Sequence, residues 1–489
     1  MLRFHFRAAL SAGLAAVAIL ATFADAHAAK KPNVLFLFTD DQRADTIAAL
    51  GNPHIKTPNL DRLVKSGFTF HNAYCMGSTR GAVCLPSRTM LHSGRSLFRL
   101  KNVNTGPNFG KSMTAAGYET FHISKRGNTP HALHKGFDHS SYLNDRKERA
   151  GGYAGRTAAN AFIEFFKSRR KGKPFFAYLG FAGPHDPRGT NAEFRKLYDP
   201  AKMPLPANYK PFHPFDNGEM GVRDERLEKW PRTKAAVRKH LFDYYAMISH
   251  MDFQIGRIFK TLEDAGEFEN TIIVFSSDHG LAIGSHGLFG KQNLYEHSMK
   301  SPLIFSGPGI PQGKSDAFAY LFDIYPTVCD LVGAAIPKSL EGKSLRPVIA
   351  GRKTAVRDTV FLAYRHVQRA VRRGDWKLIR YPQVNVTQLF NLRDDPYERR
   401  NLAGVARLAP KAKELLQRLK AQQKLYADTL PLTVENPKPA KVDVKTFFKN
   451  LPVKKRRKRR KKKRKPPQTI NVRGASLRTG SWCPSCCRC

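Results

Sequence analysis

Three apolar runs in this sequence end in acidic residues or histidine, and this pattern constrains the fold more than any other feature. Each run has the length and continuous hydrophobicity of a buried parallel strand. In open α/β sheets, ligands bind at the carboxyl ends of the strands, so the three ends offer groups for a site. The runs and the residues that follow them are 33–38 with Asp40 and Asp41, 174–181 with His185 and Asp186, and 271–276 with Asp278 and His279.

Strands alternate with helical segments along most of the chain. This order predicts the α/β class, with a large, mostly parallel sheet sandwiched by helices. Past residue 355 the pattern changes to short, turn-separated strands and one charged helix, which predicts a smaller C-terminal antiparallel α+β subdomain. The expected helices are a helix starting at 57 and segments 107–117, 154–170, 233–265, 322–332 and 408–426; the other expected strands are 118–124, 301–305, 360–364, 368–371, 376–380 and 388–390.

The expected domain boundaries follow from these changes in pattern. Residues 1–28 have basic residues, an apolar run and an Ala-His-Ala cleavage pattern, which are typical of a secretory signal peptide. No other run is long and apolar enough to predict a transmembrane segment. We therefore expect an exported protein, periplasmic or extracellular. The remaining parts are a catalytic α/β domain at 29–354, the C-terminal subdomain at 355–430 and a basic, disordered tail at 431–489.

The formal net charge of +44 indicates an anionic partner. Twelve consecutive Lys/Arg residues occupy 454–465, and residues 451–489 hold fifteen in all and no acidic residue. The rest of the chain therefore still carries 68 − 39 = +29. Nucleic acid, anionic lipid and sulfated polysaccharide would suit this charge, as would simple solubility. Export and the lack of aromatic-interleaved basic motifs argue against nucleic acid; the tail is a candidate for binding polyanions or anionic surfaces.

Cys84 opens the compact block Cys84-x-Pro86-Ser87-Arg88. Pro86 suits the first turn of a helix, so Cys84 is expected at a helix N-terminus, where the dipole favours anions. Arg88 lies one turn further on and faces the same side. A small buried cysteine at the start of an ordinary helix is the simpler interpretation of this block taken alone.

The acidic strand ends are candidates for a metal site. Adjacent carboxylates are costly unless a cation neutralises them. Three aspartates and one imidazole, namely Asp40, Asp41, Asp278 and His279, suit Ca²⁺, with Mg²⁺ as the alternative. An Asp-Asp pair by itself also occurs in many exposed turns, so the metal hypothesis depends on the second strand end.

Six blocks, spread over about residues 32–402, give the chain a specific resemblance. It resembles the formylglycine-dependent sulfatases of the alkaline phosphatase superfamily, and among them the carbohydrate sulfatases. The blocks are Pro32-Asn33-Val34…Asp40-Asp41; Thr57-Pro58-Asn59-Leu60-Asp61-Arg62-Leu63; Cys84-x-Pro86-Ser87-Arg88…Gly94-Arg95; Gly117-Tyr118-x-Thr120…Lys125; Ser277-Asp278-His279-Gly280…Gly284-x-His286-Gly287-x-x-Gly290-Lys291; and Leu389-Phe390-Asn391-Leu392…Asp395-Pro396-x-Glu398…Asn401-Leu402.

The resemblance implies a mechanism and a role for each matching residue. Cys84 would be oxidised to formylglycine by a maturation enzyme, and its hydrated aldehyde would attack sulfur. The metal ligands would be Asp40, Asp41, Asp278 and His279 together with the modified Cys84. Arg88 would hold the formylglycine hydroxyl. The sulfate would be bound by Lys125 and Lys291, and His185 would contact it or protonate the leaving group.

One stretch departs from the family pattern. Many relatives have a histidine two residues after the lysine that matches Lys125, and here that position is Gly127. His131 and His134, a few residues further on, are candidates to replace this histidine; alternatively, no residue replaces it. His286 has either a supporting or a purely structural role. Segments 126–150 and 188–232, the latter including a Pro- and aromatic-rich loop, are expected to shape substrate choice.

The sequence therefore predicts a sulfuric ester hydrolase acting on a sulfated carbohydrate. The alternatives are a phosphodiesterase or phosphonate monoester hydrolase of the same superfamily, and a non-catalytic polyanion-binding protein.

Overall fold

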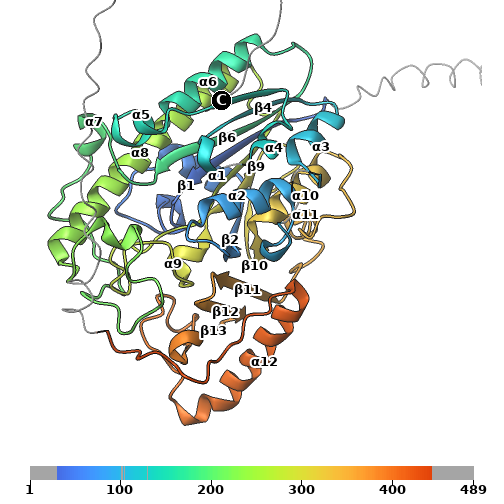
Figure 1. The fold of residues 1–489 in the computed structure, drawn as a ribbon. Coiled ribbons are helices and arrows are strands. Elements are labelled where there is room, and N and C mark those ends of the chain that lie inside the picture. The colour runs from blue at the N-terminus through green and yellow to red at the C-terminus, as the bar shows by residue number, and fades with distance from the viewer. Residues whose placement is uncertain (1–29, 101–102, 104, 129, 443–489) are drawn as a thin grey trace, which may run out of the picture. The chain divides into compact units, whose positions relative to one another are not determined.

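The structure is a computed structural model that describes residues 30–442 except 101–102, 104 and 129. The described residues form one compact unit with two β-sheets (Figure 1). The expected signal peptide and residues 443–489 of the expected tail lie outside these residues. The first part of that tail, 431–442, is described and packs on the rest of the chain: Leu432 is buried, and the carbonyl oxygen of Ala440 accepts a hydrogen bond from the backbone N–H of Asp216 at 2.9 Å. Among the described helices none is long and apolar enough to cross a membrane.

The larger sheet has nine strands in the order β10-β2-β9-β7-β1-β6-β4-β5, with β8 beside β2. The five strands from β7 to β5 are parallel to one another, whereas β9 runs antiparallel to both of its neighbours. The expected mostly parallel sheet is confirmed. Its strands are β1 (Asn33–Asp40), β2 (Phe68–Tyr74), β4 (Glu119–Ser124), β5 (His139–Tyr142), β6 (Phe175–Pro184), β7 (Thr271–Ser277), β8 (Lys300–Ser301), β9 (Leu303–Ser306) and β10 (Gly313–Tyr320).

Helices cover both faces of the larger sheet, which explains why β1 is apolar at five consecutive positions, 34–38, rather than at alternate ones. Leu35 and Leu37 pack in a core with residues of α6 and α8 on one face. Phe36 points the other way, against Phe109 of α3. Figure 1 shows α2, α3 and α10 gathered on that second side. The main helices are α1 (Pro58–Ser66), α2 (Cys84–Ser93), α3 (Phe109–Ala115), α6 (Arg156–Ser168), α8 (Lys234–Asp264) and α10 (Ile324–Leu331).

The smaller sheet has the order β14-β13-β12-β11-β3. Its four consecutive strands are antiparallel, as expected, and α12 (Ala409–Tyr426) packs on it. The fifth strand, β3 (Gly77–Ser78), comes from the segment before Cys84 and pairs in parallel with β11. Gly77 has φ 108°, and a Cβ there would lie 1.9 Å from the carbonyl oxygen of Ala363. The other strands are β11 (Thr359–Tyr364), β12 (Gln368–Arg373), β13 (Trp376–Tyr381) and β14 (Val386–Asn391).

Short helices fill several of the connections between these elements. They are α4 (His131–His134), α5 (Asp145–Ala150), α7 (Ala192–Arg195), α9 (Glu296–Met299) and α11 (Arg346–Ile349).

A buried ion network joins the two sheets. The fully buried Lys377 of β13 has its Nζ 2.9 Å from Glu296 and 2.8 Å from Glu398. Burial raises the pKa of Glu398 to about 7, although the charge of Lys377 opposes this. His286 belongs to the same junction, because its ring stacks on Tyr295 with centroids 3.9 Å apart and its Nε2 lies 2.9 Å from the carbonyl oxygen of Glu398. The structure thus favours the structural role for His286.

We predict that Lys377→Met lowers the free energy of unfolding by about 3–5 kcal/mol, because buried Glu398 loses its cation and buried Glu296 is left with its pair with Arg372 at 3.0 Å. Denaturant unfolding of the purified protein measures this loss. Lys413→Met, on the exposed side of α12, is the matched control and should change stability by less than about 0.5 kcal/mol. Equal stability of the two variants would contradict a structural role for the network.

Candidate active site

Cys84 is the first residue of α2, as the sequence predicts. The helix has Pro86 in its first turn, and every residue from Pro86 to Ser93 is buried. Arg88, one turn after Cys84, is completely buried, and its guanidinium donates to the Tyr178 hydroxyl at 3.1 Å. The helix therefore presents Cys84 and a fixed cation to the same point.

The ends of β1 and β7 meet at the Cys84 thiol. The Sγ atom lies 3.3 Å from Asp40 Oδ1 and 3.8 Å from Asp41 Oδ1. Asp278 adjoins them, because its Oδ1 accepts a hydrogen bond from the backbone N–H of Asp41 at 3.0 Å. Asp41 has a left-handed backbone conformation with φ 69°, and its carbonyl oxygen accepts a hydrogen bond from Tyr244 at 2.6 Å. These contacts turn both carboxylates of the Asp-Asp pair toward Cys84.

His279 completes this group of potential ligands. Its Nδ1 lies 2.9 Å from the carbonyl oxygen of Gly280, an arrangement in which Nδ1 carries the proton. Its Nε2 then has a free lone pair and lies 3.3 Å from the Cys84 Sγ.

Three cations neutralise the three buried carboxylates. Lys125 Nζ lies 2.8 Å from Asp40, Lys291 Nζ lies 2.8 Å from Asp41, and Arg88 Nε donates to Asp278 at 3.2 Å. Lys291 Nζ is also 3.1 Å from the Cys84 Sγ.

The pKa values follow from burial and these charges. Burial opposes ionisation of Asp40, but Lys125, His185 and Arg88 outweigh it and hold the pKa of Asp40 well below its usual range. Burial, and then the charge of Asp40, raise the pKa of Asp278. Burial and Asp40 also raise the pKa of the Cys84 thiol well above its ordinary value, so the unmodified thiol is a poor nucleophile.

His185 also reaches this centre, from the end of β6. Its Nε2 lies 3.8 Å from Asp41 Oδ2. Its Nδ1 lies 2.7 Å from the carbonyl oxygen of Asp186 and 3.2 Å from a guanidinium nitrogen of Arg149. Asp186 is in turn paired with Arg223, which places the expected loop 188–232 beside the site.

Asn128 was not among the residues predicted for the site. It donates from Nδ2 to Asp40 Oδ2 at 2.9 Å, so it shares this oxygen with Lys125. Gly127 brings no side chain to the site. His134 is not the replacement for the missing histidine, because it stacks on Tyr142 and contacts His122. In the sequence, the only local indication that residue 128 could reach the site was its polar amide, three residues after Lys125.

The donor set fits a divalent cation. One group of ligand atoms comes from Asp40, Asp41, Cys84 and His185, and a second, sharing Cys84, adds Asp278 and His279; within each group the atoms lie within 4.8 Å of one another. Three of these six residues supply carboxylate oxygens, the ligands that hard cations such as Ca²⁺ and Mg²⁺ prefer. The raised pKa of Asp278 beside Asp40 indicates crowded like charges that such an ion would relieve.

Comparisons with known proteins show the family of the chain. Residues 32–334 match the family model described as sulfatase, and residues 284–425 match the C-terminal model of N-sulphoglucosamine sulphohydrolase. An N-acetylglucosamine-6-O-sulfatase of Bacteroides thetaiotaomicron is 28% identical in an alignment that covers 82% of this chain and 88% of that protein.

Two solved structures share the fold. The structure of BT4656 in complex with its substrate D-glucosamine-2-N,6-O-disulfate has a TM-score of 0.70 and 26% identity, and covers 82% of this chain and 99% of that one. The phosphonate monoester hydrolase of Agrobacterium radiobacter has a TM-score of 0.68 at 21% identity, and covers 81% and 96%.

We predict that Ca²⁺ or Mg²⁺ stabilises protein that has been stripped of metal with a chelator. An ion present at 100 times its Kd adds about 2.7 kcal/mol to the free energy of unfolding. Asp278→Asn should remove most of this response, since it deletes one charge of the donor set. Asp316→Asn, an exposed carboxylate far along the chain from these ligands, is the control that should keep it. The measurement is Tm against ion concentration, and an unchanged response in Asp278→Asn would contradict this ligand set.

Proposed function

Because the chain belongs to the sulfatase family, we propose that it is a hydrolase of sulfate esters that acts on a sulfated carbohydrate. One observation carries the proposal: the Cys84 Sγ lies within 3.3 Å of a carboxylate, an imidazole and a lysine ammonium group at once. A metal donor set and an anion-binding cation therefore converge on one cysteine.

In this family the cysteine is oxidised to formylglycine, and the hydrated aldehyde supplies the nucleophile. We propose this modification for Cys84, which requires a maturation enzyme as a partner. A Ca²⁺ ion, with Mg²⁺ as the alternative, would be held by Asp40, Asp41, Asp278 and His279 and would supply Lewis-acid chemistry. Arg88 would fix the position of the modified side chain through its contact with Asp278.

The remaining site residues would act on the sulfate itself. Lys125 and Lys291 are positioned to bind sulfate oxygens and to balance charge that develops in the transition state. His185 Nε2 faces the same centre and would donate a proton to the leaving alcohol oxygen. In the tautomer that carries this proton on Nε2, Nδ1 accepts from the Arg149 guanidinium, and this contact keeps the ring in place.

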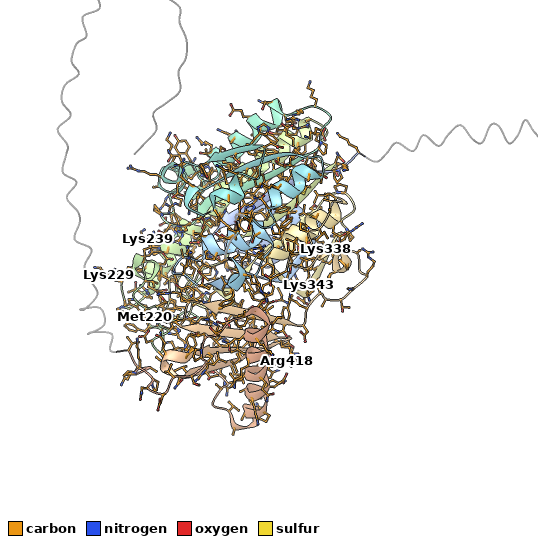
Figure 2. The ribbon with its side chains drawn as sticks, turned by 45° about the vertical axis from the view of Figure 1, so that its right-hand side comes forward. Met220, Lys229, Lys239, Lys338, Lys343 and Arg418 are labelled. Atoms are coloured by element: carbon orange, nitrogen blue, oxygen red, sulfur yellow. The ribbon has the colours of Figure 1, made fainter. Side chains whose placement is uncertain are left out.

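Two observations favour a carbohydrate among the possible sulfate esters. Two of the similar proteins, the N-acetylglucosamine-6-O-sulfatase and BT4656, act on sulfated glucosamines. The chain is also strongly basic, and its positive charge is spread over several elements, which suits a polyanionic substrate. Figure 2 shows exposed examples in Lys239 on α8, Lys338 and Lys343 between α10 and α11, and Arg418 on α12. Export by residues 1–28 to the periplasm or medium would bring the protein to such polymers.

A phosphonate monoester or phosphodiester hydrolase is the second candidate. The observation in its favour is that the phosphonate monoester hydrolase resembles this fold almost as closely as BT4656 does, with TM-scores of 0.68 and 0.70. A tetrahedral phosphoryl group would also fit between the lysines.

We predict that protein matured in the presence of a formylglycine-generating enzyme hydrolyses 4-nitrophenyl sulfate and releases sulfate from a panel of sulfated glycans. Cys84→Ala should lower kcat/KM by about 10³-fold or more, because the nucleophile is lost. Cys329→Ala, a buried cysteine outside the site, is the control. Mass spectrometry of the peptide that contains residue 84 should find an aldehyde. Turnover of phenyl phosphonate esters above that of sulfate esters would favour the second candidate.

We also predict that His185→Ala lowers kcat by about 10²–10⁴-fold on sugar sulfates, whose leaving alcohols need a proton. The loss should be much smaller on 4-nitrophenyl sulfate, because nitrophenolate leaves without protonation. Steady-state kinetics on both substrates measures the difference. Equal losses on the two substrates would mean that His185 binds the sulfate but does not act as the acid.

A further inference from the structure

Three arginines surround the His185-Asp186 segment, and one of them differs from the other two. Arg149 pairs with Asp145, and Arg223 pairs with both Asp186 and Asp224. These two guanidiniums are neutralised within the protein.

Arg188 is the arginine that differs. No carboxylate among the described residues lies within 4 Å of its guanidinium. Its Nε donates to the carbonyl oxygen of Pro184 at 3.2 Å, which fixes the position of the guanidinium group. Its Nη2 is buried and has no hydrogen-bond partner. A buried N–H donor of a charged group is costly to leave unpaired, so this nitrogen is ready for an acceptor that the described protein does not provide.

The position of Arg188 connects it to the catalytic centre. Its guanidinium lies 5.2 Å from the centroid of the Tyr244 ring. The hydroxyl of that same tyrosine donates to the carbonyl oxygen of Asp41 at 2.6 Å. Arg188 also follows His185 by three residues, and its charge contributes to the lowered pKa of Asp186. Arg188 is therefore one side chain removed from Asp41 and three residues away from His185, and among the described residues it has no hydrogen bond to a proposed metal ligand.

We propose that Arg188 is a specificity-determining residue, which binds a second anionic group of the substrate next to the sulfate that is hydrolysed. This inference rests on the proposed function and deepens it, because it names the substrate class: a saccharide that carries at least two anionic groups. A planar guanidinium binds a carboxylate or a sulfate through two parallel N–H donors. The second group is therefore either a uronate carboxylate or another sulfate.

The packing explains why an arginine suits this place. The Tyr244 ring below the guanidinium and the hydrogen bond to Pro184 hold the side chain in place before substrate arrives, so little rotamer freedom is lost on binding. A lysine would keep the charge but lose the planar pair of N–H donors.

The test compares Arg188→Gln with the wild-type protein on matched substrates. Glucosamine 6-sulfate carries one anionic group, glucosamine-2-N,6-O-disulfate carries a second sulfate, and a 6-sulfated disaccharide with a uronic acid carries a carboxylate. We expect wild-type kcat/KM to be at least tenfold higher on one of the two-anion substrates than on the first. Arg188→Gln should remove this preference through KM rather than kcat, and Arg188→Lys should restore part of it. Which of the two substrates responds identifies the second group.

Arg195→Gln is the matched control. Arg195 also lies over an aromatic ring of α8, 4.6 Å from the centroid of Phe242, but it is paired with Asp243 at 2.7 Å. This variant should keep the preference. A wild-type protein with no preference, or an Arg188→Gln variant that keeps it, would overturn the inference. Failure of the wild type on 4-nitrophenyl sulfate would instead overturn the proposed function, so the two results are distinguishable.

Discussion

Three carboxylates lie buried together at the carboxyl ends of the central strands β1 and β7, and the rest of the site depends on how their charge is balanced. β1 and β7 are adjacent and in register, with Thr39 beside Ser277, so Asp40 and Asp278 follow at neighbouring positions. Strand pairing alone therefore brings like charges together. Removing such groups from water is expensive, and only nearby cations make it tolerable. Arg88, Lys125 and Lys291 come from three separate elements to provide them.

The same contacts fix the position of Cys84. Arg88 bonds to Asp278 on one side and to Tyr178 of β6 on the other, while the Ser87 hydroxyl donates to the carbonyl oxygen of Asp278 at 2.8 Å. The first turn of α2 is therefore tied to the carboxyl end of β7 and to a side chain from the middle of β6. A cation that balances the carboxylates also positions the reactive side chain, so substitution of Arg88 would disturb both at once.

The sequence predicted the central strands well because they are buried on both faces. β1, β6 and β7 are continuous apolar runs, and their carboxyl ends hold the polar groups of the site. β2 and β10 were not predicted: they lie toward one edge of the sheet and contain polar residues such as His71 and Asp316. Asn128 was missed for a different reason. Its approach to Asp40 depends on a short helical turn after Lys125, and side-chain reach across a turn leaves no periodic signal.

The smaller sheet also takes part in shaping the site. Gln368 at the start of β12 donates from one amide nitrogen to the carbonyl oxygens of Gln292 and Asn217, at 3.3 and 3.0 Å. Gln292 follows Lys291 directly, and Asn217 belongs to the long loop that carries Arg223. One residue of the smaller sheet thus holds both the lysine beside Cys84 and the loop at the mouth of the site. The pairing of β3 with β11 anchors the segment before Cys84 in the same sheet. The C-terminal strands therefore help to hold Lys291 and this loop in place although they do not contact Cys84.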